Sequence, residues 1–136
     1  MSYLVDTNVI AEIVRRQPDA EVVSWFRAVP DTALHLSVLS LGELRKGVER
    51  LPAGVRRERL RVWLEQELPA WFEERLLPVS KEVADRWGRL AAEAGRSLPA
   101  IDGLLAATAL HHGLRLVTRN VRDFRLPGLE VVNPWR

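Results

Sequence analysis

Short apolar runs alternate with longer amphipathic stretches along this chain, and the alternation predicts strands that alternate with helices. The short runs have the length and residue types of buried strands, and they fall at residues 3–5, 34–37, 76–79, 114–117 and 130–132. The longer stretches repeat apolar residues at helical spacing, and they fall at residues 9–16, 19–29, 40–51, 55–74, 80–94 and 100–112. Strands connected by helices favour a three-layer α/β/α sandwich, with a central, mostly parallel sheet of four to five strands.

Proline and glycine mark several of the expected helix boundaries. Pro18 follows the first helical stretch, and Gly95 and Gly113 follow the last two. Pro69 lies inside the 55–74 stretch, where it predicts a kink or a break because proline has no N–H to donate.

The first strand runs directly into a carboxylate, Asp6, which is followed by Thr7 and Asn8. These residue types cap helices that follow strands. In an open α/β sheet, however, ligands bind at the carboxyl ends of the strands. Asp6 could therefore be a helix cap alone or part of a site, and the choice depends on which other residues converge on it.

Further acids fall at informative places: Glu43 early in a helix, Asp102 in the first turn of another, and Asp123 in the turn after the fourth strand. Each has an ordinary alternative role, such as pairing with Lys46, favourable placement in a helix dipole, or a turn. The topology can bring all of them to Asp6. Crowded carboxylates repel unless a cation neutralises them or some stay protonated, and Mg²⁺ prefers such oxygen ligands.

The composition narrows the class of protein. With 136 residues, 47% of them hydrophobic, the chain can bury one sizeable core, so we expect a single domain over residues 1–136. The absence of cysteine excludes disulfides and thiolate ligands, and makes zinc an improbable metal. No run is long enough to span a bilayer and no signal peptide is visible, which predicts a cytoplasmic protein without a membrane partner. The net charge of +2 leaves room for a polyanionic partner.

The order of the motifs resembles that of PIN-domain proteins, in particular VapC-type toxin ribonucleases and their FitB-like relatives. The resemblance spans almost the whole chain and rests on Leu-Val-Asp6-Thr7-Asn8, Glu43-Leu-Arg-Lys-Gly47, Ala-Ile-Asp102, Leu-Val-Thr118-Arg119-Asn120-x-x-Asp123-Phe124 and the closing Val-Val-Asn133-Pro134-Trp135. No single motif is specific, whereas the ordered set is.

The resemblance implies a ribonuclease that hydrolyses RNA phosphodiesters with Mg²⁺ or Mn²⁺. It also implies the toxin component of a type II toxin–antitoxin pair, with a small antitoxin as partner. The implied catalytic and metal-binding acids are Asp6, Glu43, Asp102 and Asp123. The implied supporting groups are Thr7, Asn8, Ser37, Thr118 and Asn120, and either Asn120 or Asp123 could dominate the fourth contribution. The basic candidates for substrate binding are Arg45, Lys46 and Arg119.

Two other classes of function compete with the nuclease. A phosphate-accepting or dehalogenase-type phosphatase also places an aspartate after its first strand, but Asn8 stands where that pattern has a second aspartate, and Glu43 and Asp123 would have no role. A non-catalytic PIN-fold binding module, whose acidic pocket receives a basic partner segment, remains open.

The tryptophans and a run of arginines each allow two roles, one of which is contact with another molecule. Large aromatic anchors are enriched at interfaces, so we expect a homodimer through helices 55–74 and 80–94. The tryptophans on these and neighbouring apolar stripes favour either core or interface, and they are Trp25, Trp63, Trp71 and Trp87. The arginines between residues 56 and 61 form either a solvated face or a nucleic-acid contact.

Overall fold

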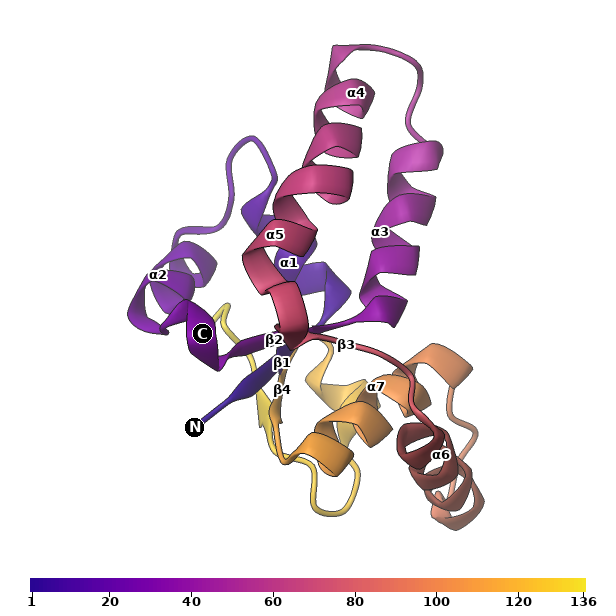
Figure 1. Ribbon diagram of the computed structural model, residues 1–136. Coiled ribbons are helices and arrows are strands. Elements are labelled where there is room, and N and C mark those ends of the chain that lie inside the picture. Colours follow the sequence, from indigo (N-terminus) through magenta and orange to yellow (C-terminus); the bar gives the residue numbers. More distant parts are fainter.

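The computed structural model describes all residues, 1–136, and shows one parallel sheet flanked by helices on both faces (Figure 1). The sheet has five strands in the order β3-β2-β1-β4-β5, and every neighbouring pair is parallel. The strands are β1 (Tyr3–Val5), β2 (Leu34–Ser37), β3 (Leu76–Leu77), β4 (Arg115–Val117) and β5 (Val131–Val132). The predicted α/β/α sandwich is confirmed.

The helices follow the strands as the sequence predicts. They are α1 (Thr7–Ile13), α2 (Ala20–Ala28), α3 (Val38–Glu49), α4 (Val55–Val62), α5 (Leu68–Phe72), α6 (Lys81–Glu93) and α7 (Ala100–His112). Short polar side chains cap several of them, which is why their starts can be read from the sequence: Asp19 accepts from the Glu21 N–H at 2.9 Å, and Ser80 accepts from the Val83 N–H at 3.2 Å. None of these helices combines the length and the apolar content needed to cross a bilayer.

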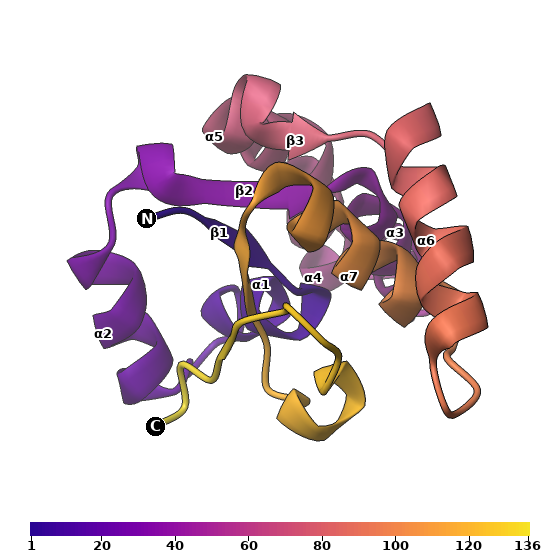
Figure 2. The same cartoon turned by 90° about the horizontal axis from the view of Figure 1, so that it is seen from below.

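Alternate residues of the central strand feed two separate cores. Val5 packs with α1 and the helices α2 to α5 on one face, whereas its neighbour Leu4 packs with α6 and α7 on the other. Figure 2 shows α6 and α7 grouped together, apart from α1 and α2. Because successive side chains of a strand point to opposite faces, this sheet is buried on both sides, as expected for parallel strands.

In the predicted helix 55–74, where Pro69 predicts a kink or a break, the structure has a π-helical turn just before the proline. The segment consists of α4, a π-helical turn over Trp63–Glu67 and α5, and the Leu68 N–H bonds to the carbonyl of Trp63, five residues back. Pro69 explains the wide turn, since its missing N–H and its ring disturb the bonding of the preceding turn. Helical structure continues through Pro69, and α5 ends at Phe72.

Other predicted boundaries shift by small amounts. α1 begins at Thr7 because Asp6 is its cap, and α3 begins at Val38 because the Ser37 hydroxyl accepts from the Leu39 N–H at 3.0 Å. Strand β3 is shorter than the predicted 76–79 run, because only Leu76 and Leu77 pair with β2. The corrections arise where a cap or a neighbouring strand, rather than the apolar pattern, sets the end of the element.

Helices α3 and α4 project from the sheet as an arm, which we define as residues 38–62 (Figure 1). Ion pairs link its two helices and the turn beyond: Arg45 to Glu65 at 2.8 Å and Arg57 to Glu49 at 3.2 Å. Such exposed pairs contribute little stability individually. They do, however, pair Arg45 and Arg57 with acids of the arm and the following turn.

Candidate active site at the carboxyl edge of the sheet

Asp6 lies at the junction of β1 and α1, in the middle of the sheet. Its Oδ1 accepts from the Thr7 N–H at 2.7 Å, and its Oδ2 accepts from the Thr118 hydroxyl at 2.8 Å. The Asn8 amide is 3.4 Å from the same Oδ2, and the side chain as a whole is only 6% exposed. The carboxylate of Asp6 is therefore held between the ends of two adjacent strands, β1 and β4.

The surroundings of Asp6 disfavour its charged form. Burial raises the pKa of this carboxyl from 3.8 to about 6, although the hydrogen bonds from Thr118 and Thr7 act in the opposite direction. The negative charges of Glu43 and Asp102 contribute to this rise, but less than burial does. A carboxylate that served only as a helix cap would not need burial next to other acids. The free-energy cost of keeping Asp6 charged in this place therefore favours a functional role.

Glu43 reaches the site from α3 through a hydroxyl network. The Thr7 hydroxyl donates to Glu43 Oε1 at 2.5 Å, and the Thr7 oxygen lies 3.0 Å from the hydroxyl of Ser40. Ser40 is fully buried and was not among the residues predicted from the sequence. Ser40 could have been found from the sequence, because it lies three residues before Glu43 and therefore on the same face of the helix.

Asp102 and Asp123 extend the acidic group from α7 and from the turn after β4. Asp102 is half-buried in the first turn of α7, and its pKa is raised by burial first and then by the charges of Asp123 and Glu43. Asp123 is exposed in the helical turn Val121–Phe124. Arg96 moderates the repulsion, since its charge lowers the pKa of Asp102 and its guanidinium donates to the Asp123 carbonyl at 2.8 Å.

Charge effects on pKa link Asp6 to Glu43 and Asp102, and link Asp102 in turn to Asp123. No three carboxylates or imidazoles are close enough in this structure to ligate one ion together. The donors are nevertheless all oxygen atoms, and their charge is only partly compensated by Arg96. Neighbouring acids with oxygen donors only and incomplete charge compensation fit a hard divalent cation that keeps some of its water ligands.

The predicted supporting residues separate into two groups. Thr7, Asn8 and Thr118 contact the acids directly, as described above, whereas Asn120 contributes its backbone N–H to the Thr118 hydroxyl at 3.0 Å. Ser37 is fully buried and caps α3, so it supports the helix that carries Glu43 rather than facing the acids.

The predicted basic residues also differ in their surroundings. Arg45 pairs with Glu49 at 3.4 Å and with Glu65 at 2.8 Å, so its charge is engaged within the arm and the next turn. Lys46 is exposed on α3. Arg119 lies beside the acidic group, with its N–H 3.4 Å from Asn8 Oδ1, and its guanidinium stacks 4.9 Å from the centre of the Trp135 ring.

A groove of about 480 Å³ leads away from the acids between α1 and the arm. Thr7, Asn8 and Glu43 line it at the acidic centre, and Arg56 and Trp63 line it on α4 and the turn that follows. Half of its lining residues are apolar. Of the four acids only Glu43 lines the groove, so the acidic centre borders an open groove of mixed polar and apolar character.

The fold is therefore a parallel α/β sheet, and acidic residues with oxygen donors lie at its carboxyl edge, where strands end and helices begin. The chain belongs to the PIN domain family, whose model matches residues 3–128. The resemblance inferred from the ordered motifs is confirmed.

Several named proteins are similar to this chain over nearly its full length. It is 38% identical to the plasmid stability protein StbB of Pseudomonas syringae pv. tomato, with 97% of each chain covered. It is 36% identical to the VapC ribonuclease Y4jK of Sinorhizobium fredii, with 97% of this chain and 96% of that protein covered. Among solved structures, FitAcB from Neisseria gonorrhoeae aligns with a TM-score of 0.90 at 36% identity, covering 98% of this chain and 99% of that one.

Proposed function

We propose that this protein is a ribonuclease that hydrolyses RNA phosphodiester bonds and acts as the toxin of a type II toxin–antitoxin pair. The observation that carries the proposal is the buried Asp6 at the carboxyl edge of the sheet, with Glu43 and Asp102 near it and Asp123 near Asp102. The proposal is supported by similar proteins named as a VapC ribonuclease and, at 37% identity, as toxin FitB of Neisseria gonorrhoeae.

We further propose that Asp6, Glu43, Asp102 and Asp123 hold Mg²⁺ or Mn²⁺. When bound at such acids, a divalent ion lowers the pKa of a ligated water and offsets charge that develops on the phosphate. The fit rests on the all-oxygen donors and on the raised pKa values of Asp6 and Asp102. Either Asp123 or Asn120 can make the fourth contribution, and the exposure of both leaves room for a small shift on loading.

The side chains around the acids fix the geometry for this chemistry. Thr118 and the Thr7 N–H hold the Asp6 carboxylate, which keeps one orientation of both oxygens. The Thr7 hydroxyl positions Glu43 relative to Asp6 although the two lie on different elements. Arg96 limits the repulsion between Asp102 and Asp123. These residues align the acids before substrate arrives, which lowers the reorganisation needed during reaction.

The partner of the chain would be a small antitoxin that covers the acidic centre. Solved toxin–antitoxin complexes support this, including FitAB bound to a DNA fragment, which aligns with a TM-score of 0.90 at 34% identity. We expect the protein to act on RNA in the cytoplasm.

The experiment is a cleavage assay with purified, partner-free protein and single-stranded RNA. We expect EDTA to stop cleavage, Mg²⁺ or Mn²⁺ to restore it, and Zn²⁺ to serve poorly. Asp6→Asn and Asp102→Asn should each lose activity by at least about a hundredfold while remaining folded. Cleavage that survives exhaustive chelation, or full activity in either variant, would refute the proposed centre. RNA binding without any cleavage would favour a non-catalytic binding module.

A further inference from the structure

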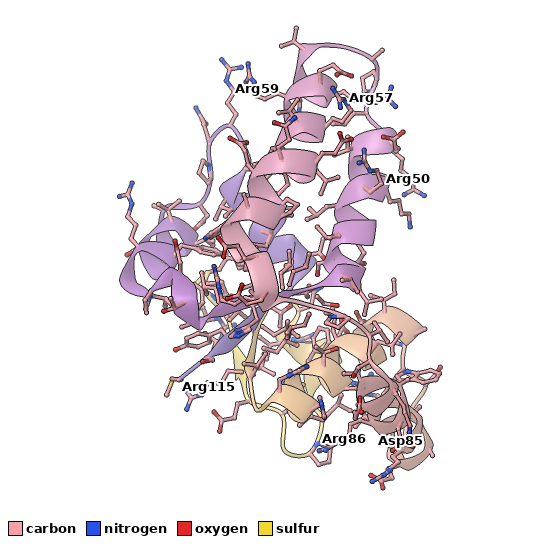
Figure 3. The ribbon with its side chains drawn as sticks, viewed as in Figure 1. Arg50, Arg57, Arg59, Asp85, Arg86 and Arg115 are labelled. Carbon is pink, nitrogen blue, oxygen red and sulfur yellow. The ribbon has the colours of Figure 1, made fainter.

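Three arginines surround a second cleft next to the groove. The cleft has a volume of about 430 Å³ and lies between the end of α1 and α4, where Val14 and Leu60 form its apolar part. Its charged lining is Arg16, Arg56 and Arg59, all of them exposed. Figure 3 shows Arg59 projecting from α4 toward the side of the α1–α2 loop, with Arg57 on the opposite side, toward α3.

None of the arginines of this cleft has an acidic partner. The neighbouring arginines of α4 are paired: Arg57 with Glu49 at 3.2 Å, and Arg61 with Glu58 at 2.9 Å and with Glu65 at 3.0 Å. The acids of the arm are thus directed toward one set of arginines, while the set around the cleft stays uncompensated. Converging, unpaired positive charges make the cleft a site of positive potential.

The cleft adjoins the groove that Glu43 lines at its other end. Val14, Arg56 and Leu60 line both hollows. The groove in turn is lined by Thr7 and Glu43 at the acidic centre. One path therefore runs from the proposed cleavage site, along the apolar side of the arm, to the three arginines.

We propose that Arg16, Arg56 and Arg59 bind the phosphates of single-stranded RNA on one side of the scissile bond. The proposal rests on the ribonuclease function above and names its distal subsite. Guanidinium groups match phosphate geometry with paired N–H donors, and an unpaired arginine has no ion pair to break before binding.

The path fits a single strand better than a duplex. Half of the groove lining is apolar and includes the partly buried Trp63. Unpaired bases present apolar faces to such a surface, whereas a duplex presents only its backbone and groove edges. The opposite ends of the path also differ in charge. Phosphates are repelled by the acids unless a cation is present, but they are attracted to the arginines under all conditions, so the distal subsite should bind RNA without metal.

The test measures binding separately from cleavage. In the Asp6→Asn protein, the affinity for a short fluorescent single-stranded RNA is measured by anisotropy in EDTA at several salt concentrations. Replacing Arg16, Arg56 and Arg59 together by Gln should weaken binding about tenfold to a hundredfold at low salt. It should also lower the slope of log affinity against log salt by about 2, since each phosphate contact of a single strand contributes about 0.7.

The matched control removes the same charge elsewhere, by replacing Arg27, Arg50 and Arg86 by Gln. These arginines are also exposed and unpaired, and they lie on α2, at the end of α3 and on α6. Figure 3 shows Arg50 and Arg86 away from the α1–α2 loop side of the arm. The control should keep the affinity and most of the slope. If both triple variants bind RNA equally weakly, the affinity depends only on the net charge of the protein, and the proposal is overturned.

Other outcomes also decide the proposal. Unchanged RNA affinity in the Arg16, Arg56 and Arg59 variant overturns it. The proposal also fails if that variant loses binding to an acidic polyglutamate peptide while its RNA binding stays intact, because the cleft would then bind acidic peptide rather than RNA. The single variant Arg59→Gln, about threefold weaker by the same reasoning, serves if the triple variant fails to fold. Failure of the ribonuclease function is seen separately, as absent Mg²⁺- or Mn²⁺-dependent cleavage by the unsubstituted protein.

Discussion

At the scale of single residues, Asp6 makes the folded state sensitive to pH. Its pKa rises from 3.8 in the unfolded chain to about 6, so the folded state holds the proton more tightly. The resulting stabilisation is fully present below about pH 4 and is lost as pH rises through 6. For a shift of this size, the metal-free protein should lose up to about 3 kcal/mol across this range.

Asp6→Asn should remove this dependence. The variant cannot ionise, so it should exceed the metal-free parent in stability at pH 7 by up to about 3 kcal/mol, less whatever the altered bonds to Thr118 and Thr7 cost. Urea unfolding of both proteins at pH 4 and pH 7 measures the difference, and added EDTA keeps both free of metal. A parent-minus-variant difference that stays constant with pH would contradict the prediction.

Thr7 should matter for activity through Glu43. Thr7→Val keeps the shape but removes the hydroxyl that donates to Glu43 at 2.5 Å, so cleavage should fall about tenfold to a hundredfold. Thr7→Ser should restore most of the rate because it restores the donor. Ser37→Ala is the contrasting variant: it removes a helix cap and should cost about 1 kcal/mol in unfolding free energy, with the rate per folded molecule unchanged.

At the scale of elements, the packing of α6 on α7 depends on one glycine. A Cβ at Gly103 would lie 2.8 Å from Nε1 of Trp87, closer than real contacts allow. Trp87 is half-buried, and its Nε1 has no hydrogen-bond partner. Because Gly103 follows Asp102 in α7, a shift at this contact also moves an acid of the proposed site.

Gly103→Ala should therefore destabilise the protein although alanine favours helices by about 1 kcal/mol. We expect a net loss of about 1–3 kcal/mol in urea unfolding, accompanied by reduced cleavage. Gly88→Ala is the matched control, since it lies in α6 with nothing within 4 Å of the added Cβ, and it should be neutral or stabilising. Equal unfolding free energies of the two variants would show that Trp87 moves aside without loss of stability.

At the scale of the whole molecule, the tryptophans expected at a subunit interface pack within their own chain. Trp63 and Trp71 lie against the core under α1 to α5, and Trp87 lies against α7. The homodimer stays a prediction, because two subunits would join two arginine-lined surfaces and offer RNA more phosphate contacts. Sedimentation at micromolar concentration should show a species of twice the 15.5 kDa chain mass, and a single species at 15.5 kDa would refute the dimer.

Much of this architecture was determined locally and was therefore visible in the sequence. The strand and helix order follows from the apolar pattern, and residues such as Ser80 and Gly113 mark helix ends by capping or by a left-handed backbone with φ 65°. Asp6 and Asp102 could be placed in advance because a strand end and a first helical turn have fixed positions in a parallel sheet.

Only the tertiary structure decided which side chains meet. The bond from Thr7 to Glu43 spans 36 positions in the sequence, and Ser40 joins it only because α3 packs beside α1. The same holds for charge: Arg45 and Arg56 are alike in the sequence, yet one is neutralised by Glu49 and Glu65 and the other is left free at a cleft. Partner choice depends on distances between elements, and a one-dimensional pattern does not contain these distances.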